Sequence, residues 1–309
     1  MTAERKPVAL PKLGVLPPVR AGACADPDWI LPFAVHAETL GYESVVAVEH
    51  PLVIGGYTSR YPYAPSGRMP LPNDCPVPDP LDLLAYIASG TSRLGLSTGV
   101  VVLPAHHPVV LAKRLATIDA LSKGRLRLCV GVGWMREELE ACGSDFETRG
   151  RRTDESIDVL RALWSDCGED GASFDGEFFR FANAHSFPKP HFPKPHGKDG
   201  IPIHIGGHSR PSIRRAALRG DGWQPLGLAG DELRSALKSL AEETEKAGRD
   251  VGDVEITLGD LLVDTNAERL AKLASFGASR VVLSCLNPDL DAARDELSSA
   301  ADRVGLLPL

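Results

Sequence analysis

The sequence predicts an α/β protein with the fold of a (β/α)8 TIM barrel, formed as one domain over residues 1–309. Eight short apolar segments alternate with amphipathic helical patterns, which is typical of parallel strands that are each followed by a helix. Several segments, among them 44–48 and 280–285, are nearly continuous apolar runs and indicate strands buried on both faces. The alternative, an open doubly wound sheet, usually carries a glycine-rich phosphate fingerprint after its first strand, and this sequence has none there.

The first helix shows how the boundaries are predicted. Asp26 is a preferred N-cap residue, Pro27 fits the first turn, and Gly41 ends the helix. By the same reasoning, strands are expected at Val8–Leu16, Ser44–His50, Arg93–Leu103, Arg125–Val132, Ile201–Ile205, Gly222–Leu226, Val254–Leu262 and Arg280–Leu286. Helices are expected from Pro27 to Leu40, over Pro80–Ser89, from His107 to Gly124, through Glu140, over Arg152–Trp164, through Arg214, and over Asp231–Ala247, Ala267–Phe276 and Asp291–Ala301.

Two insertions interrupt this alternation, at 51–79 after the second strand and at 168–200 between the fourth and fifth strands. The second contains a Phe-Asp-Gly-Glu-Phe run that predicts a hairpin over Ser173–Phe181 with an Asp-Gly turn. It also contains a tandem Phe-Pro-Lys-Pro-His repeat at 187–196, whose proline density predicts an extended connector. We expect both insertions to wall or cover the carboxyl end of the barrel, because long loops there are usually functional.

The composition argues against several classes of protein. Lys and Arg number 34 and Asp and Glu 41, so the net charge of −7 favours neither nucleic acid nor an anionic membrane as a partner. No run of about 18 apolar residues predicts a membrane span. The six cysteines lack metal or redox spacing, and His185, His191 and His196 lack the compact spacing of a zinc set. We therefore expect a cytoplasmic protein without a metal site.

The end of the fifth strand is the clearest candidate for ligand binding. Gly206 and Gly207 would let the backbone approach a ligand, and Ser209 is placed to cap the helix that follows His208. A helix N-terminus with free N–H groups binds phosphate well. The alternative is a plain strand–helix junction.

The end of the second strand carries Glu49 and His50. A histidine at this position can exchange a proton near neutral pH, although a structural role is the alternative. Side chains alternate along a strand, so one of the two residues is expected to contact the ligand and the other to orient it. Trp134, at the end of the fourth strand, would cover a planar ligand or pack on the barrel rim, while His106 and His107 are expected to cap a helix.

Five motifs occur in one order along the chain. They are Val48-Glu49-His50, the run 93–104 followed by His107-Pro108, the run 121–134, the run 150–161, and the run 201–207. Together they resemble the luciferase-like monooxygenase superfamily, from about Leu10 to Trp223.

The resemblance implies a (β/α)8 fold, a homodimer, and a site for FMN or the deazaflavin coenzyme F420. His50, with Glu49 beside it, would be the active-site histidine, and a non-prolyl cis peptide would join Gly99 to Val100 beneath the ring. The residues implied to bind the cofactor are Thr98, Gly99, Val100, Gly131, Gly133, Trp134 and the phosphate loop Gly206, Gly207, His208 and Ser209.

The position of Val132 distinguishes branches of the superfamily. Luciferases carry there an arginine that grips the FMN phosphate, whereas this chain has Gly-Val-Gly-Trp, which resembles the F420-dependent branch. The resulting hypothesis is hydride transfer between coenzyme F420 and a small organic substrate, for which Tyr57, Tyr61 and Tyr63 would form a wall. The alternatives are an FMN-dependent monooxygenase served by a separate reductase, and a non-catalytic flavin-binding protein.

Overall fold

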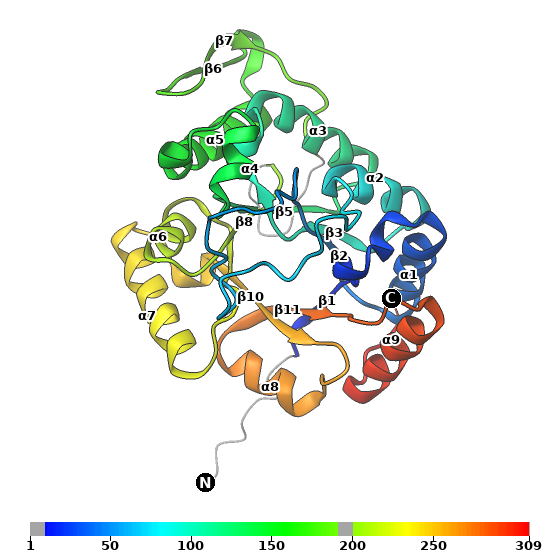
Figure 1. The fold of residues 1–309 in the computed structure, drawn as a ribbon. Helices are drawn as coiled ribbons and strands as arrows, with labels where there is room; N and C mark the ends of the chain where they lie inside the picture. Colours follow the sequence, from blue (N-terminus) through cyan, green and yellow to red (C-terminus); the bar gives the residue numbers. More distant parts are fainter. Residues whose placement is uncertain (1–9, 191–199, 309) are drawn as a thin grey trace.

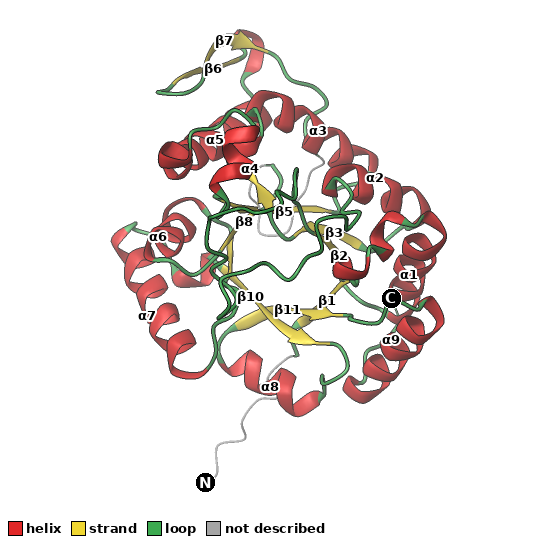
Figure 2. Cartoon of the chain, in the orientation of Figure 1, coloured by secondary structure: helices red, strands yellow, loops and turns green. Residues whose placement is uncertain are grey.

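A ring of parallel strands encloses the centre of the molecule, and helices cover it from outside, as Figures 1 and 2 show. The computed structural model describes residues 10–190 and 200–308. The strands of the ring are β1 Lys12–Leu16, β2 Ser44–Ala47, β3 Gly95–Thr98, β4 Val101–Val102, β5 Leu126–Gly131, β8 Ile203–Gly206, β9 Gly222–Gln224, β10 Glu255–Leu261 and β11 Ala278–Ser284. They pair in the order β3-β2-β1-β11-β10-β9-β8-β5, and a β3–β5 pairing closes the ring. β3 and β4 both pair with β5 and together occupy one position of the ring, so the ring has eight strand positions. The predicted (β/α)8 barrel is therefore confirmed.

Capping residues define where several helices begin. The side chains of Asp26, Asp79, Ser209, Asn266 and Asp289 each accept a hydrogen bond from a backbone N–H in the first turn of the following helix. The helices are α1 Pro27–Leu40, α2 Pro80–Gly90, α3 Pro108–Leu121, α4 Arg136–Ala141, α5 Arg149–Trp164, α6 Arg210–Arg219, α7 Gly230–Lys246, α8 Ala267–Ser275 and α9 Leu290–Val304.

The eight observed strands differ from their predicted bounds by one or more residues at an end, and in the second and third strands the differences affect candidate site residues. The second strand ends at Ala47 instead of His50, so that Glu49 and His50 lie in the connection that follows it. The third is divided into β3 and β4 at the cis peptide between Gly99 and Val100. The first begins at Lys12, and the part predicted before residue 10 lies outside the described residues.

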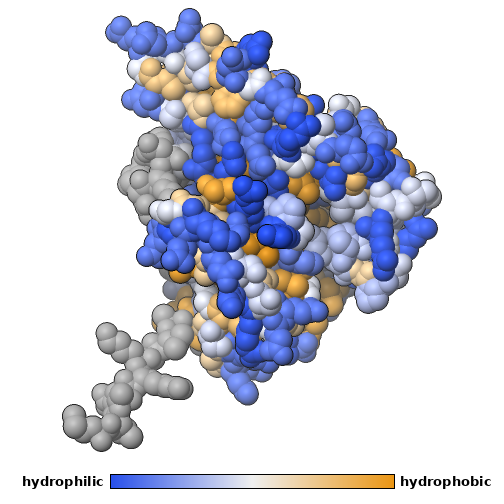
Figure 3. Space-filling model, turned by 90° about the vertical axis from the view of Figure 1, so that its left-hand side faces the viewer, coloured by the Kyte–Doolittle hydropathy of each residue, from blue (hydrophilic) through white to orange (hydrophobic). Residues whose placement is uncertain are grey.

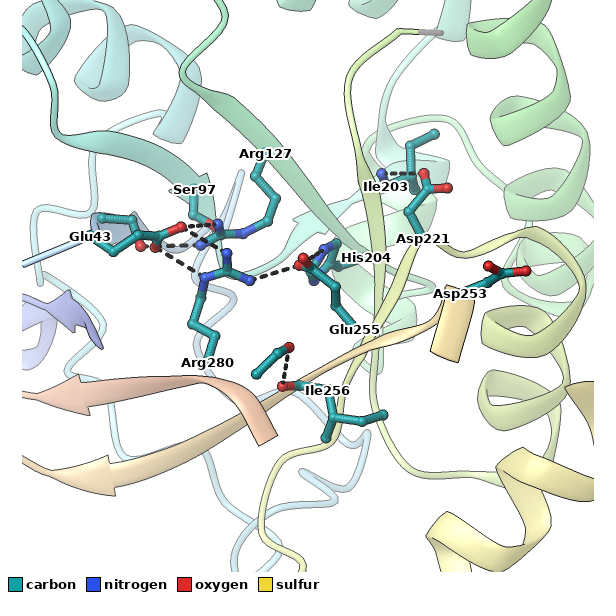
Figure 4. Close-up of polar contacts among 12 residues, drawn as sticks. Glu43, Ser97, Arg127, Ile203, His204, Asp221, Asp253, Glu255, Ile256 and Arg280 are labelled. Carbon is teal, nitrogen blue, oxygen red and sulfur yellow. Dashed lines mark hydrogen bonds and ion pairs between the residues drawn. The ribbon is translucent and has the colours of Figure 1, made fainter. Parts of the chain in front are cut away.

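The interior of the barrel is polar at its amino end. Glu43, Arg127 and Arg280 face one another there, with His204 and Glu255 alongside (Figure 4). These five residues line a cavity of about 300 Å³. The outward faces of the strands are apolar instead and pack against the helices; Val15, Leu96 and Leu283, for example, are fully buried.

The two insertions lie in different places. The loop 51–79 crosses in front of the barrel in Figure 1, as predicted. The described hairpin of the other insertion, β6 Ala172–Asp175 with β7 Arg180–Ala184, lies beyond α5 at the edge of the molecule. Glu155 of α5 holds its tip by accepting hydrogen bonds from the backbone N–H groups of residues 177–179. The prediction that this insertion covers the carboxyl end is therefore wrong for the hairpin, because the hairpin packs on the outer side of α5. Residues 191–196 of the predicted proline repeat lie outside the described residues.

The face of the molecule drawn in Figure 3 is mainly hydrophilic, with apolar residues scattered among the polar ones. Among the described helices, none combines the length and the apolar character needed to cross a membrane.

Candidate active site

The cis peptide between Gly99 and Val100 is present, as the resemblance implies. It lies between the end of β3 and the start of β4, at the carboxyl end of the barrel. The side chain of Val100 points toward the ends of β5 and β8: a Cβ added to Gly131 would lie 2.8 Å from Val100 Cγ2, and one added to Gly206 would lie 2.5 Å from Val100 Cγ1. Gly131 and Gly206 therefore make room for Val100, a role that the sequence did not indicate.

Gly99 is enclosed in the same way. A Cβ at this position would lie 2.4 Å from Val46 Cγ1 and 3.9 Å from the side-chain Nε2 of Gln224. Gln224 ends β9 and is half-buried beside the cis peptide. It is a candidate contact for a ring lying on this peptide, and its position at a strand end was the signal that could have found it.

Thr98 does not present its hydroxyl group to a ligand. The hydroxyl donates to the backbone oxygen of Cys129 and accepts from the Cys129 N–H, at 2.7 and 2.8 Å, and the residue is fully buried. Its side chain thus joins β3 to β5, and the predicted role of Thr98 in binding the cofactor stays a prediction.

Glu49 and His50 have different partners and therefore different roles. The carboxylate of Glu49 is buried; it accepts a 2.6 Å hydrogen bond from the Val102 N–H and lies 2.8 Å from His106 Nε2. Glu49 therefore supports the segment after the cis peptide and is a positioning residue. His106 binds this carboxylate instead of capping α3, and His107 makes no side-chain capping bond either, so the predicted capping roles are wrong.

His50 is held by a second carboxylate. Its Nδ1 lies 3.1 Å from Oε1 of Glu138, a residue of α4 that is only 1% exposed. If Nδ1 carries the hydrogen and donates it to this carboxylate, Nε2 is the ring nitrogen that remains for proton exchange. No pattern in the sequence indicated Glu138, which is 88 residues from His50 and lies on the helix after β5.

Aromatic rings extend from His50 across the carboxyl end of the barrel. The ring of Trp134 makes edge contacts with those of His50, Tyr57 and Tyr61, at centroid distances of 6.3, 5.3 and 5.1 Å. Tyr63 continues the series toward His208, at 5.6 Å. Trp134 thus packs against the loop 51–79 at the rim and joins the wall that the three tyrosines were predicted to form.

Burial raises the pKa of Tyr61 and of Tyr63 above the ordinary value of 10.0. Both phenols therefore stay neutral near pH 7, and the wall carries hydroxyl groups without negative charge.

The turn after β8 combines the features of an anion site. Gly207 has a φ of +91°, a conformation that favours glycine, and its carbonyl oxygen accepts a 2.8 Å hydrogen bond from the indole N–H of Trp223. Nδ1 of His208 lies 2.7 Å from the Leu226 oxygen. Ser209 caps α6, whose first turn contains no acidic residue. The fixed turn and the positive end of the helix fit a phosphate group.

The residues present fit a planar cofactor that carries a phosphate. Val100 and Gln224 lie beside the cis peptide, and the aromatic wall extends from His50 to His208 in the turn before α6. The described residues contain no cluster of three or more metal-ligating side chains, and His191 and His196 lie outside them.

Comparison with known proteins assigns the chain to a family. The model of the luciferase-like monooxygenase family matches residues 12–300. An uncharacterised protein of Mycobacterium tuberculosis H37Rv is 33% identical over 229 residues, which cover 74% of this chain and 76% of the relative. An F420-dependent glucose-6-phosphate dehydrogenase of Amycolatopsis mediterranei is 27% identical over 289 residues, covering 90% of this chain and 78% of the relative.

Solved structures share the fold. An F420-dependent secondary alcohol dehydrogenase, in complex with an F420–acetone adduct, matches with a TM-score of 0.74 at 17% identity, covering 96% of this chain and 99% of the other. The monooxygenase RslO1 from Streptomyces bottropensis matches with a TM-score of 0.70 at 20% identity, covering 94% and 98%. Because the family model spans almost the whole barrel, the chain belongs to the luciferase-like monooxygenase family and is an oxidoreductase of that family.

Proposed function

We propose that this protein is an oxidoreductase that uses coenzyme F420 and acts on a small organic carbonyl compound or the corresponding alcohol. The observation that carries the proposal is the pairing of His50 with the buried carboxylate of Glu138 at the rim that also holds the cis peptide and the α6 N-terminus. The F420-dependent relative that aligns over 90% of this chain supports the choice of cofactor, as does Val132 at the position where luciferases carry their arginine.

The bound deazaflavin would supply or accept a hydride at the substrate carbon. In carbonyl reduction the hydride adds to the carbon and a proton must reach the oxygen; in alcohol oxidation both leave. His50 would move that proton through Nε2, while Glu138 fixes the imidazole through Nδ1. The loop 51–79 and Trp134 would exclude water from the rim.

Parallel fluorescence titrations with F420 and FMN test the cofactor, with wild-type protein and His50→Ala side by side. We expect F420 to bind both proteins equally and FMN to bind more weakly. With an alcohol or ketone that the wild-type protein converts, His50→Ala should lower the turnover rate by roughly a hundredfold or more, which is the usual contribution of a proton-transfer group.

Tight FMN binding without F420 binding would instead identify a flavin-dependent monooxygenase that needs a partner reductase. Unchanged turnover in His50→Ala would remove this residue from the proton transfer.

A further inference from the structure

The inward faces of three neighbouring strands are charged at their amino ends and uncharged at their carboxyl ends. At their amino ends Lys12 of β1, Arg280 of β11 and Glu255 of β10 line the charged cavity. Side chains alternate between the two faces of a strand, and laterally paired residues share a face. Since Lys12 pairs with Arg280, these strands begin with charged inward residues.

At the carboxyl ends of the same strands the inward residues are uncharged. The register pairs Leu16 of β1 with Ser284 of β11, and Ser284 with Leu261 of β10, so these three residues form one row. The Cys285 N–H donates to the Leu16 oxygen at 2.9 Å, which extends the ladder by one residue. Leu286 follows two residues after Ser284, at the next inward position of the alternation. We call Leu16, Leu261, Ser284 and Leu286 the leucine wall.

The leucine wall is open, unlike the outward leucines beside it. Leu262 and Leu283 are fully buried under the helices, whereas Leu261 is 38% exposed and Leu286 is 60% exposed. Gly259, two residues before Leu261 on the same strand, is exposed, and a Cβ at this position would meet only the Val282 oxygen, at 3.9 Å. Apolar surface of this kind gains free energy when a ligand covers it.

Two acidic side chains of the adjoining segments have partners outside the leucine wall. Asp260 binds Arg269 on α8, with Arg269 Nε at 2.9 Å, and Asp289 caps α9. Arg20, which follows β1, is exposed, and its charge acts on Tyr61 of the aromatic wall. A phosphate or carboxylate placed on the leucine wall would lose its hydrating water. The inward positions of β1, β10 and β11 offer no charged partner there, so binding such a group would cost free energy.

We propose, on the basis of the function proposed above, that the leucine wall is the substrate subsite and that it takes the apolar body of an uncharged ketone or secondary alcohol. β1 lies beside β2, which leads to His50, so a carbonyl oxygen can face His50 while the rest of the substrate covers Leu16, Leu261 and Leu286. Leu261 is then a specificity-determining residue, and sugar phosphates are poor substrates.

Calorimetric titration with acetone, 2-hexanone, 2-octanone and glucose 6-phosphate tests this subsite, with and without F420. We expect the affinity of wild-type protein to rise about fourfold for each methylene group that reaches the wall. Leu261→Asn should weaken 2-octanone binding about tenfold and leave acetone binding nearly unchanged. Leu121→Asn is the matched control, because Leu121 is 80% exposed at the end of α3, outside the wall.

Affinity that is independent of ketone length, equal effects of the two variants, or tighter binding of glucose 6-phosphate than of 2-octanone would each overturn the proposal. The F420 titration is read separately. A protein that binds the longer ketones more tightly but not F420 would keep the subsite and refute the proposed cofactor.

Discussion

At the scale of single residues, the side chain of Val100 explains two glycines of the site. Gly131 and Gly206 end neighbouring strands, and the side chain of Val100 occupies the space that a Cβ on either glycine would need. The sequence suggested that these glycines let a ligand approach the backbone. The structure adds that they first accommodate the segment after the cis peptide, so the ligand meets Val100 as well as the glycine backbone.

This packing predicts that Gly206→Ala lowers the free energy of unfolding by about 1–3 kcal/mol, the usual cost of overfilling a packed site. Gly259→Ala is the control, since its nearest neighbour would be 3.9 Å away. Urea unfolding measures both. In a Val100→Ala background the cost of Gly206→Ala should largely disappear, because the clashing methyl groups are gone. Equal stability of the two alanine variants would contradict the packing argument.

At the scale of elements, α4 joins the active-site histidine to the loop 51–79. Glu138 binds His50, and its neighbour Glu137 accepts hydrogen bonds from the backbone and hydroxyl groups of Thr58 and Ser59. Burial opposes the ionisation of Glu137, but the hydrogen bonds from Ser59 and Thr58 outweigh it and lower its pKa from 4.5 to about 2.

A carboxylate with a lowered pKa stabilises the folded loop above pH 4.5, and this contribution is lost as the pH falls from 4.5 toward 2. We therefore expect hydrogen-exchange protection factors in residues 53–63 to fall over this pH range. Glu137→Gln should lower them already at pH 7. Glu140→Gln, on the same helix and exposed, should not. Protection that is the same in both variants would show that Glu137 does not hold the loop.

At the scale of the whole molecule, the two ends of the barrel serve different purposes. The amino end is closed by ion pairs: Arg280 is 4% exposed and binds Glu43 at 2.7 Å and Glu255 at 2.9 Å. Burial opposes the ionisation of Glu43, but Arg127 and Arg280 hold its pKa below the ordinary range. His204 and Arg280 lower the pKa of Glu255 in the same direction. Stability from both carboxylates is thus present above pH 4.5 and decreases only as the pH falls below it.

Removing Arg280 should therefore destabilise the whole barrel. We expect Arg280→Leu to lower the free energy of unfolding by about 3–5 kcal/mol, because it leaves buried carboxylates without their partner. Arg234→Leu should cost less than about 1 kcal/mol, since that ion pair with Asp231 is exposed. Chemical denaturation with circular dichroism compares the two. If Arg280→Leu changed the free energy of unfolding only slightly, Arg127 and His204 would be sufficient partners for the carboxylates of Glu43 and Glu255.

The sequence by itself determined the features that depend on short stretches of chain. These are the alternation of strands and helices, the capped helix starts at Asp26 and Ser209, and the glycine-rich turn after β8. Local spacing was enough because hydrophobic period, caps and turns are properties of neighbouring residues. The homodimer and the cytoplasmic location stay predictions.

Only the tertiary structure decided which side chains meet. Glu138 reaches His50 from 88 residues away, Thr98 turns its hydroxyl to Cys129, and Glu49 supports Val102 instead of a ligand. The hairpin β6–β7 lies outside α5 although its chain position suggested a lid. The physical reason is that closing the barrel brings separate strand ends to one rim, and packing there, which no local pattern records, selects the partner of each polar group.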